Sequence, residues 1–199
     1  MKLTQTIIAL GLSALTLALT GCVVTSVYPF YSEKDLAFEP ALVGVWKKTG
    51  QSDEHWKFER ASGNGYRITS ESGGKTTVLR GHVFKLHGQT FLDLCTTNWK
   101  EDIQPEPVPS HILAHIVQLT PTLKMSDLNY DWLQELLARN PKAVRHIVIQ
   151  TGEKPEDRRI VLTADTAGLQ QFVLKHLNTE AAWDTGAELQ PDPARSQSH

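Results

Sequence analysis

The chain has little of several features that mark particular classes of protein. It contains only two cysteines in 199 residues, so it predicts no disulfide framework. Its most apolar stretch, from about Ile7 to Leu19, is shorter than the roughly 20 residues that a membrane-spanning helix needs. Its 20 Lys and Arg residues stand against 22 Asp and Glu residues, without a basic run. Nucleic acid is therefore not an expected partner.

The sequence also lacks the common catalytic motifs. No Gly-x-Ser-x-Gly, phosphate-binding loop or dinucleotide fingerprint occurs. His111 and His115 are four residues apart, but the zinc-protease pattern needs a glutamate where Ile112 stands. On a strand the two histidines share one face, so we expect them to face solvent and expect no metal or other cofactor. Cys95 follows the apolar run "FLDL" and is expected to act as a small buried apolar residue, not as a nucleophile. Enzymatic activity has no candidate residues, although the sequence leaves the question open.

The first 22 residues, "MKLTQTIIALGLSALTLALTGC", have the layout of a secretory signal peptide: a charged start, an apolar segment and small residues before Cys22. The end of this stretch, "LTGC", resembles the lipobox of bacterial lipoproteins. That resemblance implies cleavage before Cys22, attachment of lipid to its thiol and acylation of the new amino terminus. Because Val23 and not aspartate follows, it also implies the outer membrane in a host that has two. An ordinary signal peptide that leaves Cys22 unmodified is the alternative.

Removal of residues 1–21 leaves 178 residues with a net charge of −3, which suits a single domain. We expect an anchor and aromatic segment at 22–40, a β-rich domain at 41–185, and a disordered tail at 186–199. The anchor segment contains Tyr28, Phe30 and Tyr31, whose rings either pack onto the domain or lie in the membrane interface.

Most of the domain alternates apolar and polar residues, which is typical of half-buried strands. The pattern appears in "EHWKFER", "GYRITS", "KTTVLRGHVFKLHGQTFLDLC", "HILAHIVQL", "TLKMS", "HIVIQ" and "RIVLTA". Gly81 is interpreted as a possible bulge. Two segments have helical spacing instead, near 129–140 and 165–178, with Asp165 as an N-cap of the second. The fold class predicted is mainly β: an antiparallel barrel or strongly curved sheet with two amphipathic helices packed on it.

The first strand, "LVGVW", resembles the Gly-x-Trp motif that opens lipocalin-type barrels, with Gly44 and Trp46 at the matching positions. The resemblance implies that Trp46 closes the barrel base beneath a late arginine, here Arg158 or Arg159. The stretches "VYPFYSEKDLAFEPALVGVW", "YDWLQELL" and "LTADTAGLQQFVLKH" also resemble a group of uncharacterised bacterial lipoproteins.

Two functions from different classes follow. We expect a membrane-anchored lipoprotein that binds a small apolar ligand in its barrel without catalysis. The alternative is a structural or interaction lipoprotein that contacts an envelope protein while side chains fill the barrel. Large inward residues, with Trp46, Trp56, Phe58, Tyr66 and Phe84 as candidates, would favour the alternative, whereas a ligand-sized cavity would favour the first.

Overall fold

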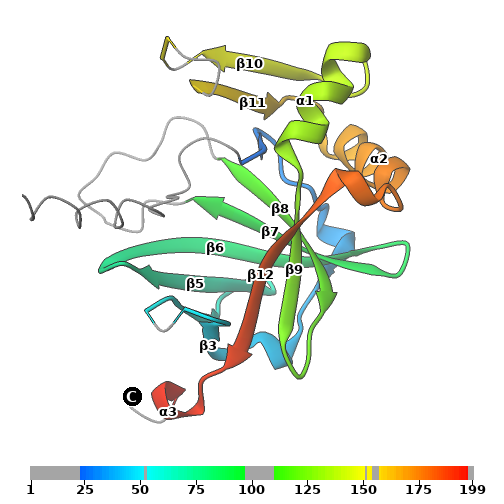
Figure 1. Ribbon diagram of the computed structural model, residues 1–199. Coiled ribbons are helices and arrows are strands. Elements are labelled where there is room, and N and C mark those ends of the chain that lie inside the picture. The colour runs from blue at the N-terminus through cyan, green and yellow to red at the C-terminus, as the bar shows by residue number, and fades with distance from the viewer. Residues whose placement is uncertain (1–22, 52, 97–109, 151, 154–156, 197–199) are drawn as a thin grey trace, which may run out of the picture.

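A computed structural model describes residues 23–51, 53–96, 110–150, 152–153 and 157–196 (Figure 1). Cys22 lies outside the described residues. The first strands along the chain are β1 (Thr25–Ser26), β2 (Leu36–Ala37), β3 (Gly44–Lys48), β4 (His55–Arg60), β5 (Gly65–Ser72) and β6 (Lys75–Leu86). They are followed by β7 (Gln89–Thr96), β8 (His111–Gln118), β9 (Leu123–Leu128), β10 (His146–Gln150), β11 (Arg158–Leu162) and β12 (Trp183–Pro191).

The helices in the described residues are few and short. They are α1 (Tyr130–Arg139), α2 (Thr166–His176) and α3 (Pro193–Ser196), with single 3-10 turns η1 (Glu33–Asp35), η2 (Pro40–Leu42) and η4 (Glu180–Ala182). Both longer helices begin at the kind of side-chain cap that the sequence favours. Asn129 accepts a hydrogen bond from the Trp132 N–H, and Asp165 accepts one from the Gly168 N–H. None of the helices in the described part of the chain has the length and apolar character to cross a bilayer.

Eight strands close into an antiparallel barrel, which confirms the predicted fold class. Strands β3 to β9 each pair with the next strand along the chain, and β12 pairs with both β9 and β3 to complete the ring. In Figure 1, β12 runs beside β9 down the front of the barrel. Helices α1 and α2 lie at one end of it, as the sequence predicted, whereas α3 lies at the opposite end (Figure 1).

Between β9 and β12 the chain leaves the barrel and forms α1, β10, β11 and α2. Strand β10 pairs with β11, β11 pairs in parallel with β1, and β1 pairs with β8 through Ser26 and His111. Further along, β8 pairs with β9 instead, from Ala114 onward. The sheet therefore branches at β8, and its three-strand branch lies with α1 and α2 at one end of the molecule (Figure 1).

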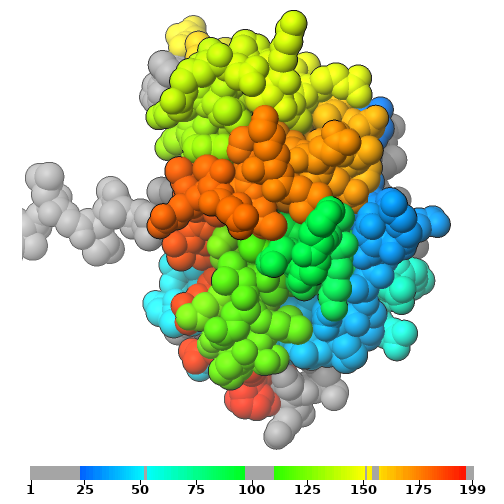
Figure 2. Space-filling model, turned by 90° about the vertical axis from the view of Figure 1, so that its right-hand side faces the viewer, coloured from blue at the N-terminus to red at the C-terminus, as the bar shows by residue number. Residues whose placement is uncertain are grey.

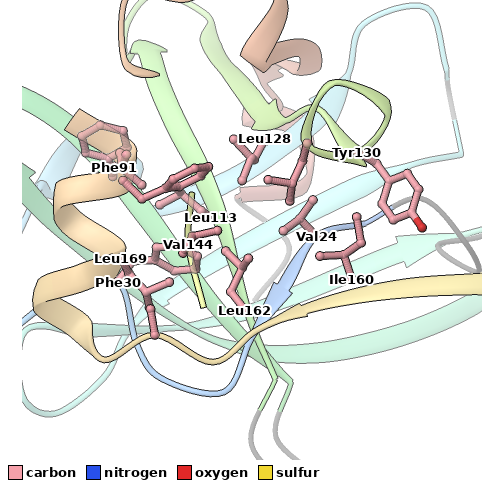
Figure 3. Close-up of a cluster of buried hydrophobic side chains, with 14 of the residues drawn as sticks. Val24, Phe30, Phe91, Leu113, Leu128, Tyr130, Val144, Ile160, Leu162 and Leu169 are labelled. Atoms are coloured by element: carbon pink, nitrogen blue, oxygen red, sulfur yellow. The ribbon is translucent and has the colours of Figure 1, made fainter. Parts of the chain in front are cut away.

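Two apolar cores result from the alternation of side chains along the shared strands. The barrel interior holds one core, in which Phe58, Tyr66 and Leu92 are almost completely buried. The second core lies outside the barrel, between the strands, the branch and the two helices, and Figure 3 shows its side chains converging from these elements. Its members include Val24, Phe30, Phe91, Leu113, Leu133, Leu162, Leu169 and Phe172.

Two predicted boundaries are wrong. Residues 186–191 are not a disordered tail, because they form most of β12, and Leu189 is fully buried inside the barrel. The segment before residue 41 is not separate from the domain either. Val24 and Phe30 are buried in the outer core, and Tyr31 packs against that core, whereas Tyr28 remains about half exposed. Of the two readings of these aromatic residues, packing onto the domain is therefore confirmed for Phe30 and Tyr31.

Candidate functional site

The barrel interior is the place where a lipocalin-type protein would hold a ligand, and here side chains occupy it. The largest buried side chains of this core come from four strands of the ring and from the turn η2 before β3: Leu42, Phe58, Tyr66, Ile68, Leu92 and Leu123. Gly81 contributes to this close packing and is not a bulge, because the pairing of β6 is regular on both sides of it. A Cβ at Gly81 would collide with Cδ1 of Ile68, so a larger residue there would force the Ile68 side chain to move.

Trp46 belongs to this interior, as the lipocalin resemblance implied. It lies on β3 with its neighbour Gly44, it is buried, and its indole N–H donates a hydrogen bond to the Leu42 carbonyl at 2.9 Å. The prediction that a late arginine covers the Trp46 ring is wrong. Arg158 and Arg159 are exposed on β11, in the branch outside the barrel, because the late part of the chain leaves the ring before it returns as β12.

The sequence also predicts the wrong position for Phe84, which was expected inside the barrel. Trp46, Phe58 and Tyr66 are buried in the interior core and Trp56 packs against it, but Phe84 belongs to the outer core. Alternation on β6 explains the difference, since Val83 already points inward.

A hollow on the surface borders the outer core and lies outside the barrel interior. It has a volume of about 280 Å³ and opens between α2 and the loop before β10, where Arg145, Asp165, Phe172 and Lys175 contribute to its walls. This volume is at the lower limit of ligand pockets, which span roughly 300–1,000 Å³.

The most unusual chemistry is a buried polar cluster on the outer face of the barrel. His82 on β6 lies opposite Asp93 on β7, and His111 begins the neighbouring strand β8. The side chains of Val83, Leu92 and Ala114 alternate with them and point inward. Outward-facing residues of a barrel normally meet water, yet Asp93 is fully buried and His111 nearly so. Residues 23–38, which we call the N-terminal segment, cover them.

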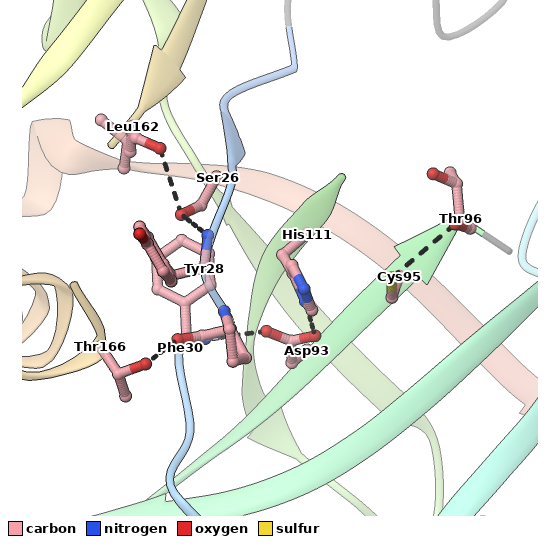
Figure 4. A network of polar contacts seen from close by, with 10 residues as sticks. Ser26, Tyr28, Phe30, Asp93, Cys95, Thr96, His111, Leu162 and Thr166 are labelled. Carbon is pink, nitrogen blue, oxygen red and sulfur yellow. Dashed lines mark hydrogen bonds and ion pairs between the residues drawn. The ribbon is translucent and has the colours of Figure 1, made fainter. Parts of the chain in front are cut away.

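Asp93 is the centre of the cluster, and each of its carboxylate oxygens has a partner (Figure 4). Oδ1 lies 2.8 Å from Nδ1 of His111, and Oδ2 accepts a hydrogen bond from the Phe30 N–H at 3.0 Å. Buried carboxylates are costly unless they are paired in this way. Asp93 therefore joins β8 to the N-terminal segment.

Tyr31 closes the cluster over His82, with ring centroids 4.7 Å apart. Burial, with a further contribution from the negative charge of Asp93, raises the pKa of Tyr31 to about 12. Burial also lowers the pKa of His82 below its usual value, although Asp93 opposes that shift. Both rings are thus held in their uncharged forms at neutral pH.

Helix α2 holds the N-terminal segment from the other side. Thr166 donates to the Pro29 carbonyl at 2.8 Å, and the side-chain amide of Gln170 donates to the Phe30 carbonyl at 3.0 Å and to Asp35 at 2.9 Å. Burial of Asp35 opposes its ionisation, but hydrogen bonds from Ser32 and Gln170 outweigh this effect and lower its pKa. In Figure 2 the blue segment lies against the orange helix and the green strands.

The Asp93 and His111 pair has the geometry of the aspartate and histidine in a hydrolytic triad. A triad also needs a nucleophile in an accessible site. Cys95 is the cross-strand neighbour of His111, but its thiol is buried and donates to the Thr96 carbonyl at 3.7 Å. The N-terminal segment occupies the face where a substrate would have to approach. We conclude that the cluster fastens this segment.

The two histidines singled out in the sequence lie on one face, as predicted, but His111 is buried and His115 is only partly exposed to solvent. His111 is bonded to Asp93, and His115 stacks on Phe91 at 4.8 Å between centroids. Within the described ranges, no three His, Cys, Asp or Glu side chains are arranged to hold a metal ion.

Sequence reasoning missed Asp93 as a site residue. Its signal was an acid inside the apolar run "FLDLC", where an exposed strand position would be the ordinary interpretation.

Comparison of the chain with protein-family models, with curated proteins and with solved structures gave no match.

Proposed function

We propose that this protein is a lipid-anchored lipoprotein of the bacterial cell envelope that acts through its surface, as a scaffold for contacts with another envelope component. The observation that carries the proposal is the packed barrel interior, where Phe58, Tyr66 and Leu92 occupy the space that a ligand would need. The proposal favours the interaction function over the binding of a small apolar ligand.

Membrane attachment rests on the lipobox-like "LTGC" that ends at Cys22. The structure that follows supports an anchor with a short link. Val24 is already buried, and the Val27 N–H donates to the Leu162 carbonyl at 3.0 Å. The buried cluster around Asp93 then holds Phe30. A body fixed this close to its acyl chains is held at the membrane surface, on the outer membrane if Val23 has the effect that the lipoprotein resemblance implies.

Ligand binding is the second candidate. It is favoured by the hollow beside α2, whose wall residues Phe172 and Lys175 offer an apolar and a charged contact. Such a ligand would lie on the surface of the molecule and not within the barrel.

The test uses the full chain purified from the membrane fraction of its own host. Intact-mass spectrometry should find an acylated Cys22 at the amino terminus, and Cys22→Ala should be processed incorrectly or released from the membrane. An unmodified amino terminus produced by cleavage elsewhere would reject the anchor.

Native mass spectrometry of the same material addresses the barrel. We expect no co-purified small molecule and no binding of a fluorescent naphthalene probe. Phe58→Ala is the positive control, because loss of a fully packed ring opens an apolar cavity that can admit such a probe. A probe that binds the natural protein as well as this variant would show that the interior is not filled.

A further inference from the structure

Strand β10 exposes three consecutive apolar side chains, which is unusual for a folded domain. Ile147, Val148 and Ile149 are 49%, 55% and 42% exposed. Strand β10 lies at the end of the sheet order and pairs with β11 along one edge, and its other edge has no strand partner among the described residues. Its apolar surface is therefore available for a contact outside this chain.

The three side chains alternate between the two faces of the hairpin formed by β10 and β11. Ile147 and Ile149 share a face with Val161. Val148 is the cross-strand partner of the buried Ile160, and these two side chains share the other face. A single added strand would satisfy the open edge but would leave the face that carries Ile147 and Ile149 exposed. A lipid layer, by contrast, could cover both the open edge of β10 and the face that carries Ile147 and Ile149.

The register of β1 limits how far this surface can lie from the proposed lipid anchor. Thr25 pairs with Val161, and Val161 pairs with Ile147, so the three residues form one row across the branch. Adjacent strands are separated by about 4.8 Å, which places Ile147 roughly 10 Å from Thr25. Cys22 is three residues before Thr25, and three virtual bonds of about 3.8 Å limit it to within roughly 11 Å of that row.

We propose that the apolar surface of β10 lies in the interfacial layer of the same membrane that holds the acyl chains of Cys22. This inference rests on the proposed function, because it needs the lipid anchor. Membrane interfaces retain water, so the open backbone groups of β10 can stay hydrated while its side chains contact the acyl boundary.

Apolar burial and not net charge provides the attraction. The described end of the hairpin carries Arg158 and Arg159, but also Glu153 and Asp157. The arginines can contact lipid phosphates, while the acids remain in the aqueous layer.

The experiment measures membrane depth at one position in the acylated protein. Val148→Cys is labelled with an environment-sensitive fluorophore and reconstituted into phosphatidylethanolamine and phosphatidylglycerol vesicles that carry a nitroxide-labelled lipid. Val117→Cys is the matched control. Val117 is a valine that is 60% exposed, and it lies near the end of β8 that is away from its pairing with β1. The buried Cys95 is replaced by serine in both proteins.

We expect a blue-shifted emission and roughly twofold stronger quenching at position 148 than at position 117, as for a side chain at interfacial depth. Equal quenching at the two positions would overturn the inference. Intact-mass spectrometry of the same sample separates the two proposals: an acylated Cys22 with equal quenching leaves the proposed function standing, whereas absence of the acyl group rejects that function itself.

A second outcome would also overturn the inference. A blue shift at position 148 that persists without vesicles and increases with protein concentration would mean that β10 pairs with a second copy of the chain. Ile149→Lys supplies an independent check. It should reduce the quenching at position 148 by roughly half if the strand enters the interface, because charged side chains avoid that depth.

Discussion

The barrel interior and the layer outside it are built from opposite faces of the same strands, and they differ in their chemistry. On β7, Leu92 points into an interior whose buried members are aliphatic and aromatic, whereas Asp93 points outward into a layer that adds a buried, paired carboxylate to apolar packing. In the interior, the polar atoms of Trp46 and Tyr66 bond to backbone groups of Leu42 and Glu39, just before β3. The outer layer must hold one particular segment in one register, and directional hydrogen bonds achieve that.

This comparison supports the proposal that the protein acts through the outside of its barrel. The buried polar side chains of the described residues are Ser26, Asp93 and His111, and all three belong to the N-terminal segment or to its attachment. The interior contributes stability, while the outer layer controls how the body is connected to the residue proposed to carry lipid.

The largest expected effect is in the interior. Trp46→Ala removes a buried ring and its hydrogen bond to Leu42, and the closed barrel has little freedom to collapse around the void. We expect the free energy of unfolding to fall by about 3–5 kcal/mol, measured from denaturant midpoints. Val117→Ala is the control, and it should change stability by less than about 0.5 kcal/mol because its side chain is exposed. Equal, small losses in both variants would mean that the barrel is not closed around Trp46.

A smaller effect with a different signature is expected in the outer layer. Asp93→Asn keeps the size of the side chain but removes the charge that pairs with His111, and we expect a loss of about 1–3 kcal/mol. Because Asp93 also accepts from the Phe30 N–H, limited proteolysis should cut residues 23–38 faster than in the natural protein. Trp46→Ala, compared at equal global stability, should not show this local sensitivity. If cleavage of the segment were unchanged in Asp93→Asn, Asp93 would not be holding the N-terminal segment against the barrel.

Much of the barrel could be predicted from the sequence because alternation is a local signal. It indicated strands β4 to β9, and the caps at Asn129 and Asp165 agree with helices α1 and α2 where helical spacing predicted them. Strand β12 could not be found in this way. Its register shifts between Thr185 and Glu188, and Leu189 is its one fully buried apolar residue. It is a strand because two neighbours pair with it, and pairing between distant segments is not visible in a local pattern.

The candidate site was hidden for a related reason. Alternation placed His111 and His115 on one face, but it could not reveal that another part of the chain covers that face. The burial of Asp93 depends on Phe30, which is 63 residues earlier. The lipobox-like motif at Cys22 is the opposite case, since it is a purely local pattern that lies outside the described residues, and its role stays a prediction.

Acid should weaken the outer layer more than the interior. Burial lowers the pKa values of His82, His115 and His176, so the unfolded chain binds more protons than the folded chain as the pH falls through about 6.5. Burial raises the pKa of Asp127 to about 6, so this carboxyl binds its proton more readily in the folded chain and offsets part of the loss near and below pH 6. Stability should therefore decrease mainly between pH 7.5 and 6, by at most about 1.4 kcal/mol per pH unit for each histidine.

His82→Gln tests the share of that pH dependence that belongs to the cluster, since it removes one titrating ring while leaving the interior unchanged. The slope of unfolding free energy against pH should become shallower. His87→Asn is the control, because His87 is exposed in a turn with φ of 48°, a conformation that asparagine tolerates. An identical slope in both variants would show that His82 does not remain uncharged in the folded protein.

The smallest effect is expected on the water-facing side of α1, beyond both cores. Glu135 and Arg139 form an ion pair at 3.0 Å one helical turn apart, but their side chains are 69% and 72% exposed. Pairs of this kind contribute about 0.3–0.5 kcal/mol and are weakened by salt. Glu135→Gln should therefore lower stability by no more than this in dilute buffer, and the difference should disappear at high salt in parallel denaturation curves. Asp93→Asn should keep most of its loss at high salt, because its carboxylate is buried where ions cannot screen it. If the stability losses of both variants disappeared at high salt, Asp93 would be behaving as a surface charge. The outer layer around Asp93 would then not differ from an ordinary exposed face.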